Sequence, residues 1–161
     1  MDLDVLKVKF THSNTVRDKK PYTIYEIEVR SSSTITWVIY KRYSSFHQLH
    51  QDLMKSPLIS PEQKLNLPQL PPKRLTRSLA VEFVEKRKNE LQDYLRAMLE
   101  TPGLVHSPVI LAFLEVPDSV RPMLAAAANN QQIGGSMGNQ AGGMRSEDER
   151  RHSEKVRDAA P

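Results

Sequence analysis

The chain has 161 residues, enough for one globular domain with a hydrophobic core, and its net charge of +4 does not by itself predict nucleic-acid binding. It contains no cysteine, so disulfides and thiolate metal sites are excluded and a cytosolic, reducing compartment is the simplest expectation. No apolar run approaches the ~20 residues that a membrane-spanning helix needs, and the acidic start at Met1–Asp4 lacks a positively charged leader, so we expect a soluble, cytoplasmic protein.

Three segments near the N-terminus alternate apolar and polar residues with a period of two, as half-buried strands do. Their apolar faces carry Leu6, Val8 and Phe10 in the first, Tyr25, Ile27 and Val29 in the second, and Trp37 and Ile39 in the third. Ser31-Ser32-Ser33-Thr34 joins the last two segments, so an antiparallel hairpin is the simplest arrangement. The third strand leads directly into Lys41-Arg42-Tyr43.

Helical spacing begins after this strand. Ser44 is the expected N-cap of a helix whose buried positions are Phe46, Leu49 and Leu53. Residues 56–73 then contain five prolines, which argue against a helix and favour partly extended polyproline II structure.

Two more helices are expected after the proline-rich stretch. The longer one runs from about Ser78 to Glu100, where Thr101-Pro102-Gly103 stops it. The shorter one starts at Pro108 with Ser107 as its cap. Its apolar residues, expected to be buried, are Ile110, Leu111, Phe113 and Leu114.

Glycine marks the main boundary of the chain. Five of the six glycines lie within residues 134–143, in a stretch with too few large apolar side chains to offset the entropy of ordering. We therefore expect a folded domain over residues 1–120, a flexible Ala/Asn/Gln/Gly-rich linker over 121–145, and a charged segment over 146–161. Ser146-Glu147-Asp148-Glu149 matches a capping box, so a helix is expected to start there.

Positive charge is concentrated in the middle of the chain. Residues 41–88 contain ten basic and four acidic side chains, a net charge of +6, so the remainder of the chain carries −2. Such a local excess suits a partner that carries phosphates. Charge alone, however, favours a solvated basic surface.

Arg87 falls within the apolar stripe of the long helix, which at ~100° per residue also contains Ala80, Val84, Leu91, Leu95 and Met98. A buried guanidinium is costly unless an anion meets it or its stem reaches water. The pattern leaves an internal ion pair and an anionic ligand equally open.

Three other residues indicate an anionic ligand. Arg42 ends a strand just before a helix start, where backbone N–H groups also attract anions. Tyr43 offers a flat ring to a sugar-like ring, and Lys73 leaves a rigid proline loop. If these residues converge with Arg87, they form a pocket for a ligand with more than one phosphate and several hydroxyls.

These motifs resemble those of PX (phox-homology) domains over residues 1–118. Lys41-Arg42-Tyr43-Ser44-Ser45-Phe46 is similar to the family's Arg-Arg-Tyr-Ser-x-Phe signature, with Lys41 where arginine is commoner. Residues 67–73 resemble its proline loop, and Lys86-Arg87-Lys88 resembles the segment around its long-helix arginine. The resemblance implies an α+β fold, in which a three-stranded antiparallel sheet packs on a helical subdomain of three to four helices with a polyproline loop.

The resemblance also implies a function. It predicts a non-enzymatic module that binds phosphatidylinositol 3-phosphate on endosomal or vacuolar membranes, as in sorting nexins and vacuolar PX-containing SNARE proteins. Carried over by position, Arg42 binds the 3-phosphate, Tyr43 stacks under the inositol ring, Lys73 meets the 1-phosphate and Arg87 hydrogen-bonds the 4- and 5-hydroxyls. Ser44, at the helix start, completes the expected headgroup site.

Residues 74–79 correspond to the family's membrane-insertion loop. The resemblance implies that Leu75 and Leu79 enter the membrane interface, while Arg74 and Arg77 meet anionic lipid at about 1 kcal/mol each. The alternative, in which both leucines pack as ordinary loop and helix-start residues, is almost as well supported.

A protein-interaction module is the main alternative function. Residues 68–73 fit a proline-rich ligand ending in a basic residue, of the kind that Src-homology-3-type domains bind. Leu67 and Leu70, interleaved with the prolines, instead favour packing of the loop on its own domain. Further protein partners are expected through this loop or the C-terminal segment, and the isolated domain is expected to be monomeric.

Enzymatic and nucleic-acid functions are poorly supported. No P-loop, Gly-x-Ser-x-Gly or His-Glu-x-x-His pattern occurs, and no cofactor is expected. His47 and His50 have no further His or Cys cluster beside them, so a solvated helix edge is favoured over a metal site. The chain also lacks an exposed aromatic stripe or a recognised nucleic-acid-binding motif.

Overall fold

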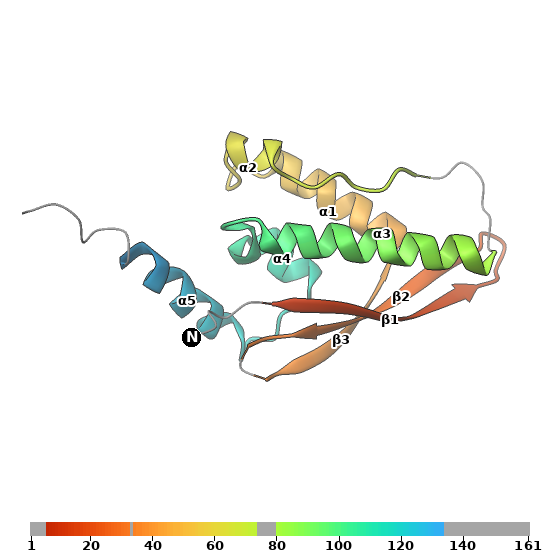
Figure 1. Ribbon diagram of the computed structural model, residues 1–161, viewed down its shortest axis with the longest axis horizontal. Helices are drawn as coiled ribbons and strands as arrows, with labels where there is room; N and C mark the ends of the chain where they lie inside the picture. The colour runs from red at the N-terminus through yellow and green to blue at the C-terminus, as the bar shows by residue number, and fades with distance from the viewer. Residues whose placement is uncertain (1–5, 33, 74–79, 134–161) are drawn as a thin grey trace, which may run out of the picture.

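The computed structural model describes residues 6–32, 34–73 and 80–133. A three-stranded antiparallel sheet comes first, made of β1 (Lys7–Val16), β2 (Tyr22–Arg30) and β3 (Thr36–Arg42) in that order. The helices that follow are α1 (Tyr43–Lys55), α2 (Pro61–Leu65), α3 (Val81–Glu100), the 3-10 turn η1 (Leu104–His106), α4 (Pro108–Phe113) and α5 (Arg121–Ile133). In Figure 1, α1, α3 and α4 lie on one side of the sheet. The predicted α+β fold is confirmed.

The period-two pattern places one apolar face of the sheet against these helices. Phe10 of β1 pairs with Ile27 of β2, which pairs with Ile39 of β3, so a buried row crosses all three strands. Val38 and Tyr40 point to the opposite face and are exposed. The alternation read from the sequence is therefore correct.

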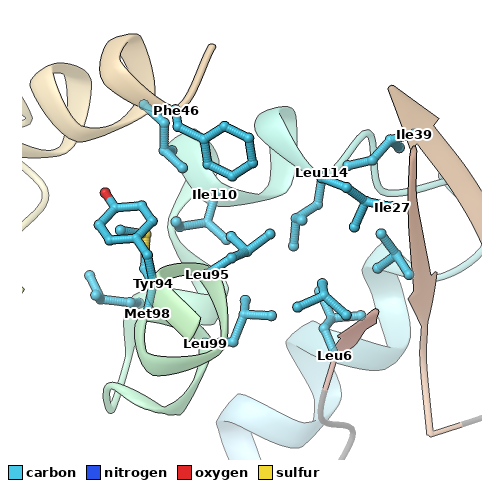
Figure 2. Close-up of a cluster of buried hydrophobic side chains, with 14 of the residues drawn as sticks. Leu6, Ile27, Ile39, Phe46, Tyr94, Leu95, Met98, Leu99, Ile110 and Leu114 are labelled. Carbon is cyan, nitrogen blue, oxygen red and sulfur yellow. The ribbon is translucent and has the colours of Figure 1, made fainter. Parts of the chain in front are cut away.

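The hydrophobic core lies between the sheet and the helices. Figure 2 shows Phe46 of α1, Leu95 of α3 and Ile110 of α4 in one cluster of buried side chains with Leu114 and with Ile27 and Ile39 of the sheet. Each such side chain contributes about 1.5–3 kcal/mol through its burial. A hydrogen bond also fastens the end of α4 to the sheet, because the indole Nε1 of Trp37 donates to the Leu114 carbonyl at 2.8 Å.

The strand β3 runs into α1 without a connecting loop. Arg42, still extended at φ −110° and ψ 165°, is the N-cap of α1, and it makes no side-chain cap hydrogen bond. The prediction that Ser44 caps this helix is wrong, since Ser44 is already the second helical residue. The basic motif therefore lies at the junction of a strand end and a helix start.

A short helix interrupts the proline-rich stretch, so the prediction that residues 56–73 contain no helix is wrong at α2. Ser60 caps α2 through a capping box, in which its hydroxyl accepts from the Gln63 N–H and its own N–H donates to the Gln63 side chain. Pro61 occupies the first helical position, where its missing N–H costs nothing. Residues 67–73 belong to no helix or strand.

Helix α5 replaces the first part of the predicted linker. Residues 125–128 are alanines, the strongest helix formers, and Val120 and Leu124 are buried, which anchors the start of the helix. The prediction of a flexible linker is therefore wrong for residues 121–133, which form α5. Residues 134–161, which include the rest of that linker and the charged segment, lie outside the described part of the chain.

The end of α3 and the start of α4 agree with the prediction from the sequence. Helix α3 ends at Glu100, and Gly103 adopts the left-handed conformation at φ +81° that favours glycine. Helix α4 begins at Pro108 behind Ser107. Helix α3 begins at Val81 with Ala80 as its N-cap, so it starts later than the expected position near Ser78.

Candidate phosphoinositide-binding site

Arg87 lies in the buried stripe of α3, as its position in the helical pattern predicts. Only 8% of the residue is exposed. Its Nη2 donates to the Pro72 carbonyl at 2.8 Å, and its guanidinium lies over the Tyr43 ring at 4.4 Å from the centroid. Within the described ranges no carboxylate forms an ion pair with it, so the internal ion pair left open by the sequence is not found there.

The proline-rich segment is attached to both helices through two consecutive carbonyls. The hydroxyl of Tyr43, the first residue of α1, donates a hydrogen bond to the Pro71 carbonyl at 2.7 Å. Arg87 of α3 donates one to the Pro72 carbonyl. Leu67 and Leu70 are half-buried against the core, so the loop packs on its own domain as predicted. These contacts fix the chain immediately before Lys73, whose side chain is exposed.

Arg42 is exposed at the end of β3, and its guanidinium lies over the ring of Tyr22, 5.7 Å from the centroid. The first turn of α1 follows directly, and the first N–H groups of a helix lack partners within it. No contact among the described residues joins Arg42 to Arg87 or Lys73. The structure therefore brings together Tyr43, Arg87 and the chain at Lys73. Arg42 precedes Tyr43 in the chain, but its guanidinium contacts Tyr22 instead.

An open cleft of about 610 Å³ lies between α1 and α4. Its lining residues are Arg42, Ser44, Ser45, Gln48, Leu49, Asp52, Val109, Ala112 and Phe113. Tyr43 and Arg87 do not line it. Ser44 is thus placed with Arg42, but apart from Arg87.

Lys41 has a structural environment different from that of Arg42. Its Nζ lies 2.6 Å from an oxygen of Glu115 and 5.1 Å from the ring centroid of Phe113. Because successive strand residues point to opposite faces, Lys41 and Arg42 are directed apart. Lysine in place of the commoner arginine is therefore accommodated by contacts with the segment around α4.

His50 and Tyr94 form a contact that was not predicted from the sequence. His47 is exposed, as a solvated helix edge requires, but His50 is half-buried and its Nδ1 lies 3.0 Å from the Tyr94 hydroxyl oxygen. The Tyr43–Arg87 and His50–Tyr94 contacts are seven residues apart on both helices, so α1 and α3 run in the same direction (Figure 1). Burial, and secondarily the nearby Tyr43, raises the pKa of Tyr94, which therefore stays neutral and holds its proton.

The stability of the domain is expected to fall as the pH is lowered from 7 to 5, partly through His50. Burial, helped by the positive charge of nearby His47 when protonated, holds the pKa of His50 below its usual 6.5. The unfolded chain then binds this proton more tightly than the folded one, so the contribution is complete above pH 6.5 and is lost as the pH falls through the folded pKa. Urea unfolding at the two pH values checks this.

His50→Gln, which keeps a polar side chain without a titrating ring, should reduce the change in unfolding free energy between pH 7 and pH 5. His47→Gln is the matched control, because it removes an exposed histidine on the same helix and only the smaller influence on His50. An equal reduction in both variants would contradict a special role for the buried contact.

The loop that was expected to contact the membrane is not part of the described structure. Arg74, Leu75, Arg77 and Leu79, expected to contact the membrane, lie outside the described residues. In the described part of the chain, no helix combines the length and apolar character needed to cross a bilayer. The same residues contain no cluster of three or more His, Cys, Asp or Glu side chains suited to a metal ion.

The chain is similar to known proteins that contain PX domains. A model of the family described as PX domain matches residues 29–117. The SH3 and PX domain-containing protein 2A of Danio rerio is 31% identical over 137 residues, which cover 81% of this chain and 12% of that protein. Sorting nexin-13 of Mus musculus is 31% identical over 94 residues, which cover 56% of this chain and 9% of that protein.

Among solved structures, the PX domain of mouse SNX19, crystallised with a bound sulphate ion, matches with a TM-score of 0.53 and 21% identity. The match covers 71% of this chain and 99% of that domain, and it supports the fold. The chain spans only about a tenth of the two curated relatives above. With a family match over more than half of its residues, the chain belongs to the PX domain family of phosphoinositide-binding, membrane-targeting modules.

Proposed function

We propose that this PX domain binds phosphatidylinositol 3-phosphate and holds its protein on endosomal or vacuolar membranes during trafficking or fusion. The observation that supports this most is the environment of Arg87. Its guanidinium is buried, and among the described residues it pairs with no carboxylate but contacts the Pro72 carbonyl and the Tyr43 ring. A buried cation with such partial compensation favours an anionic or polyhydroxylated ligand.

The proposed roles of the four site residues are those that the resemblance to PX domains implies. Arg42, exposed beside a helix start, binds the 3-phosphate through its bidentate fork. Lys73 meets the 1-phosphate, and Arg87 hydrogen-bonds the 4- and 5-hydroxyls, so that phosphates there are crowded out. Tyr43 contacts the inositol ring with the part of its own ring that Arg87 does not cover.

Membrane attachment adds a second, less selective contribution. Arg74 and Arg77 are proposed to meet anionic lipid while Leu75 and Leu79 enter the interface. A headgroup pocket with a small apolar wedge is a reversible anchor, and firm recruitment takes a second signal. That signal is proposed to come from a protein partner or another part of the protein.

The proline-rich segment is less well suited to a Src-homology-3-type partner. The Pro71 and Pro72 carbonyls already accept hydrogen bonds from Tyr43 and Arg87, and Leu70 packs on the core. A partner would have to release these contacts before it could bind the segment. Lipid binding therefore remains the better proposal.

A lipid-panel co-sedimentation assay on the whole chain tests the proposal. Vesicles of equal surface charge carry phosphatidylinositol, its 3-phosphate, its 4-phosphate, its 4,5-bisphosphate or phosphatidylserine alone. We expect recovery to be highest on the 3-phosphate and to persist as salt is raised, because a specific pocket is screened less than surface charge. Equal recovery on all charge-matched vesicles would contradict a headgroup-selective site.

A further inference from the structure

Tyr22 supports Arg42 from the neighbouring strand. Ile24 of β2 pairs with Arg42 of β3, so Tyr22, two residues earlier, lies on the same face of the sheet and diagonally beside Arg42. The guanidinium carbon of Arg42 is 5.7 Å from the centre of the Tyr22 ring, within the range of a cation–π contact. Tyr22 itself is 37% exposed at the first position of its strand.

This contact orients the cation without neutralising it. A guanidinium stacks on an aromatic ring through its flat face, while its N–H donors point outward in the plane and stay available. Within the described ranges Arg42 pairs with no carboxylate. The Arg87 guanidinium also lies over a tyrosine ring, that of Tyr43, so both arginines of the candidate site make cation–π contacts with tyrosines.

We propose that Tyr22 is a positioning residue for phosphate binding, whose ring holds the Arg42 guanidinium with its N–H groups directed at the 3-phosphate. The inference rests on the proposed function. The aromatic ring of Tyr22 makes the contact with Arg42, and its hydroxyl is not required.

The test measures binding of a short-chain, water-soluble phosphatidylinositol 3-phosphate by calorimetry. Tyr22→Leu is expected to weaken binding about two- to fivefold, the value of an exposed cation–π contact, while Tyr22→Phe keeps the affinity of the unaltered chain. Tyr40→Leu, which changes another exposed tyrosine on the same face, is the matched control and should leave affinity unchanged. All three variants should keep their melting temperatures within a few degrees, since the replaced side chains are partly exposed.

A double variant that combines Tyr22→Leu with Arg42→Ala shows whether Tyr22 acts on binding through Arg42. Measured on the residual binding at high ligand concentration, Tyr22→Leu should cause no further loss once Arg42 is absent. A further loss there, an equal loss in Tyr22→Phe, or a loss confined to vesicles and absent with the soluble lipid would each overturn the inference. If Arg42→Ala itself binds normally, the proposed function fails. If Arg42→Ala loses binding while Tyr22→Leu matches the unaltered chain, only the role of Tyr22 fails.

Discussion

Arg42→Ala is expected to remove most of the binding to vesicles that carry phosphatidylinositol 3-phosphate, while leaving the folded domain intact. Each charge-assisted hydrogen bond to a phosphate contributes about 1.5–3 kcal/mol, so loss of a bidentate pair weakens binding by a factor of at least ~100. The fold should tolerate the change, because Arg42 is exposed and makes no side-chain cap hydrogen bond. Liposome co-sedimentation measures the loss, and thermal unfolding checks the fold.

Two variants separate the guanidinium fork from simple positive charge. Arg42→Lys keeps the charge but not the planar fork, so its affinity should fall between those of the unaltered chain and Arg42→Ala. Arg30→Ala removes the same charge from another exposed position, at the end of β2. There the Nη2 of Arg30 lies 3.6 Å from the Oε1 of Glu28. If Arg30→Ala reduces recovery as much as Arg42→Ala, long-range attraction to the membrane explains the binding and the proposed pocket does not.

Much of this site could be predicted from residue spacing, because local periodicity determines which face of an element a residue occupies. The 3.6-residue period placed Arg87 in a buried stripe, and the period of two placed Ile27 and Ile39 on the buried face of the sheet. The spacing of Ser60 and Gln63 also matches a capping box and so predicts the start of α2. The prolines around it favoured the opposite prediction, that no helix forms there. Errors of this kind come from local signals that compete with one another.

The contacts that complete the site could not be predicted, because they depend on how separate elements meet. The Tyr22–Arg42 contact requires the register of β2 on β3, and the His50–Tyr94 contact requires the rotation of α1 and α3 about their axes. Helix α5 depends on the burial of Leu124 by residues distant in sequence. No pattern within one segment contains this information.

Arg87→Ala is expected to lower both stability and affinity. The substitution removes a hydrogen bond from a charged donor to the Pro72 carbonyl and a cation–π contact with Tyr43, together worth about 2–4 kcal/mol before the relief of a buried charge is counted. That relief offsets part of the loss, so the domain should stay folded at 25 °C with a melting temperature several degrees lower. Affinity for phosphatidylinositol 3-phosphate should fall at least about tenfold, and selectivity against 4- and 5-phosphorylated lipids should narrow, because the hydrogen bonds to the two hydroxyls are lost.

A second variant distinguishes direct contact with the ligand from support of the proline segment. Tyr43→Phe removes the hydrogen bond to the Pro71 carbonyl but keeps the ring under Arg87, so it loosens the chain before Lys73 without removing a cation. If Arg87 touches the headgroup, Arg87→Ala must lose more affinity than Tyr43→Phe at a comparable loss of melting temperature, and it alone should change the ranking of lipids. If both variants lose affinity in proportion to stability and keep the same ranking, Arg87 serves to hold the proline segment in place. Selectivity would then have to come from residues other than Arg87.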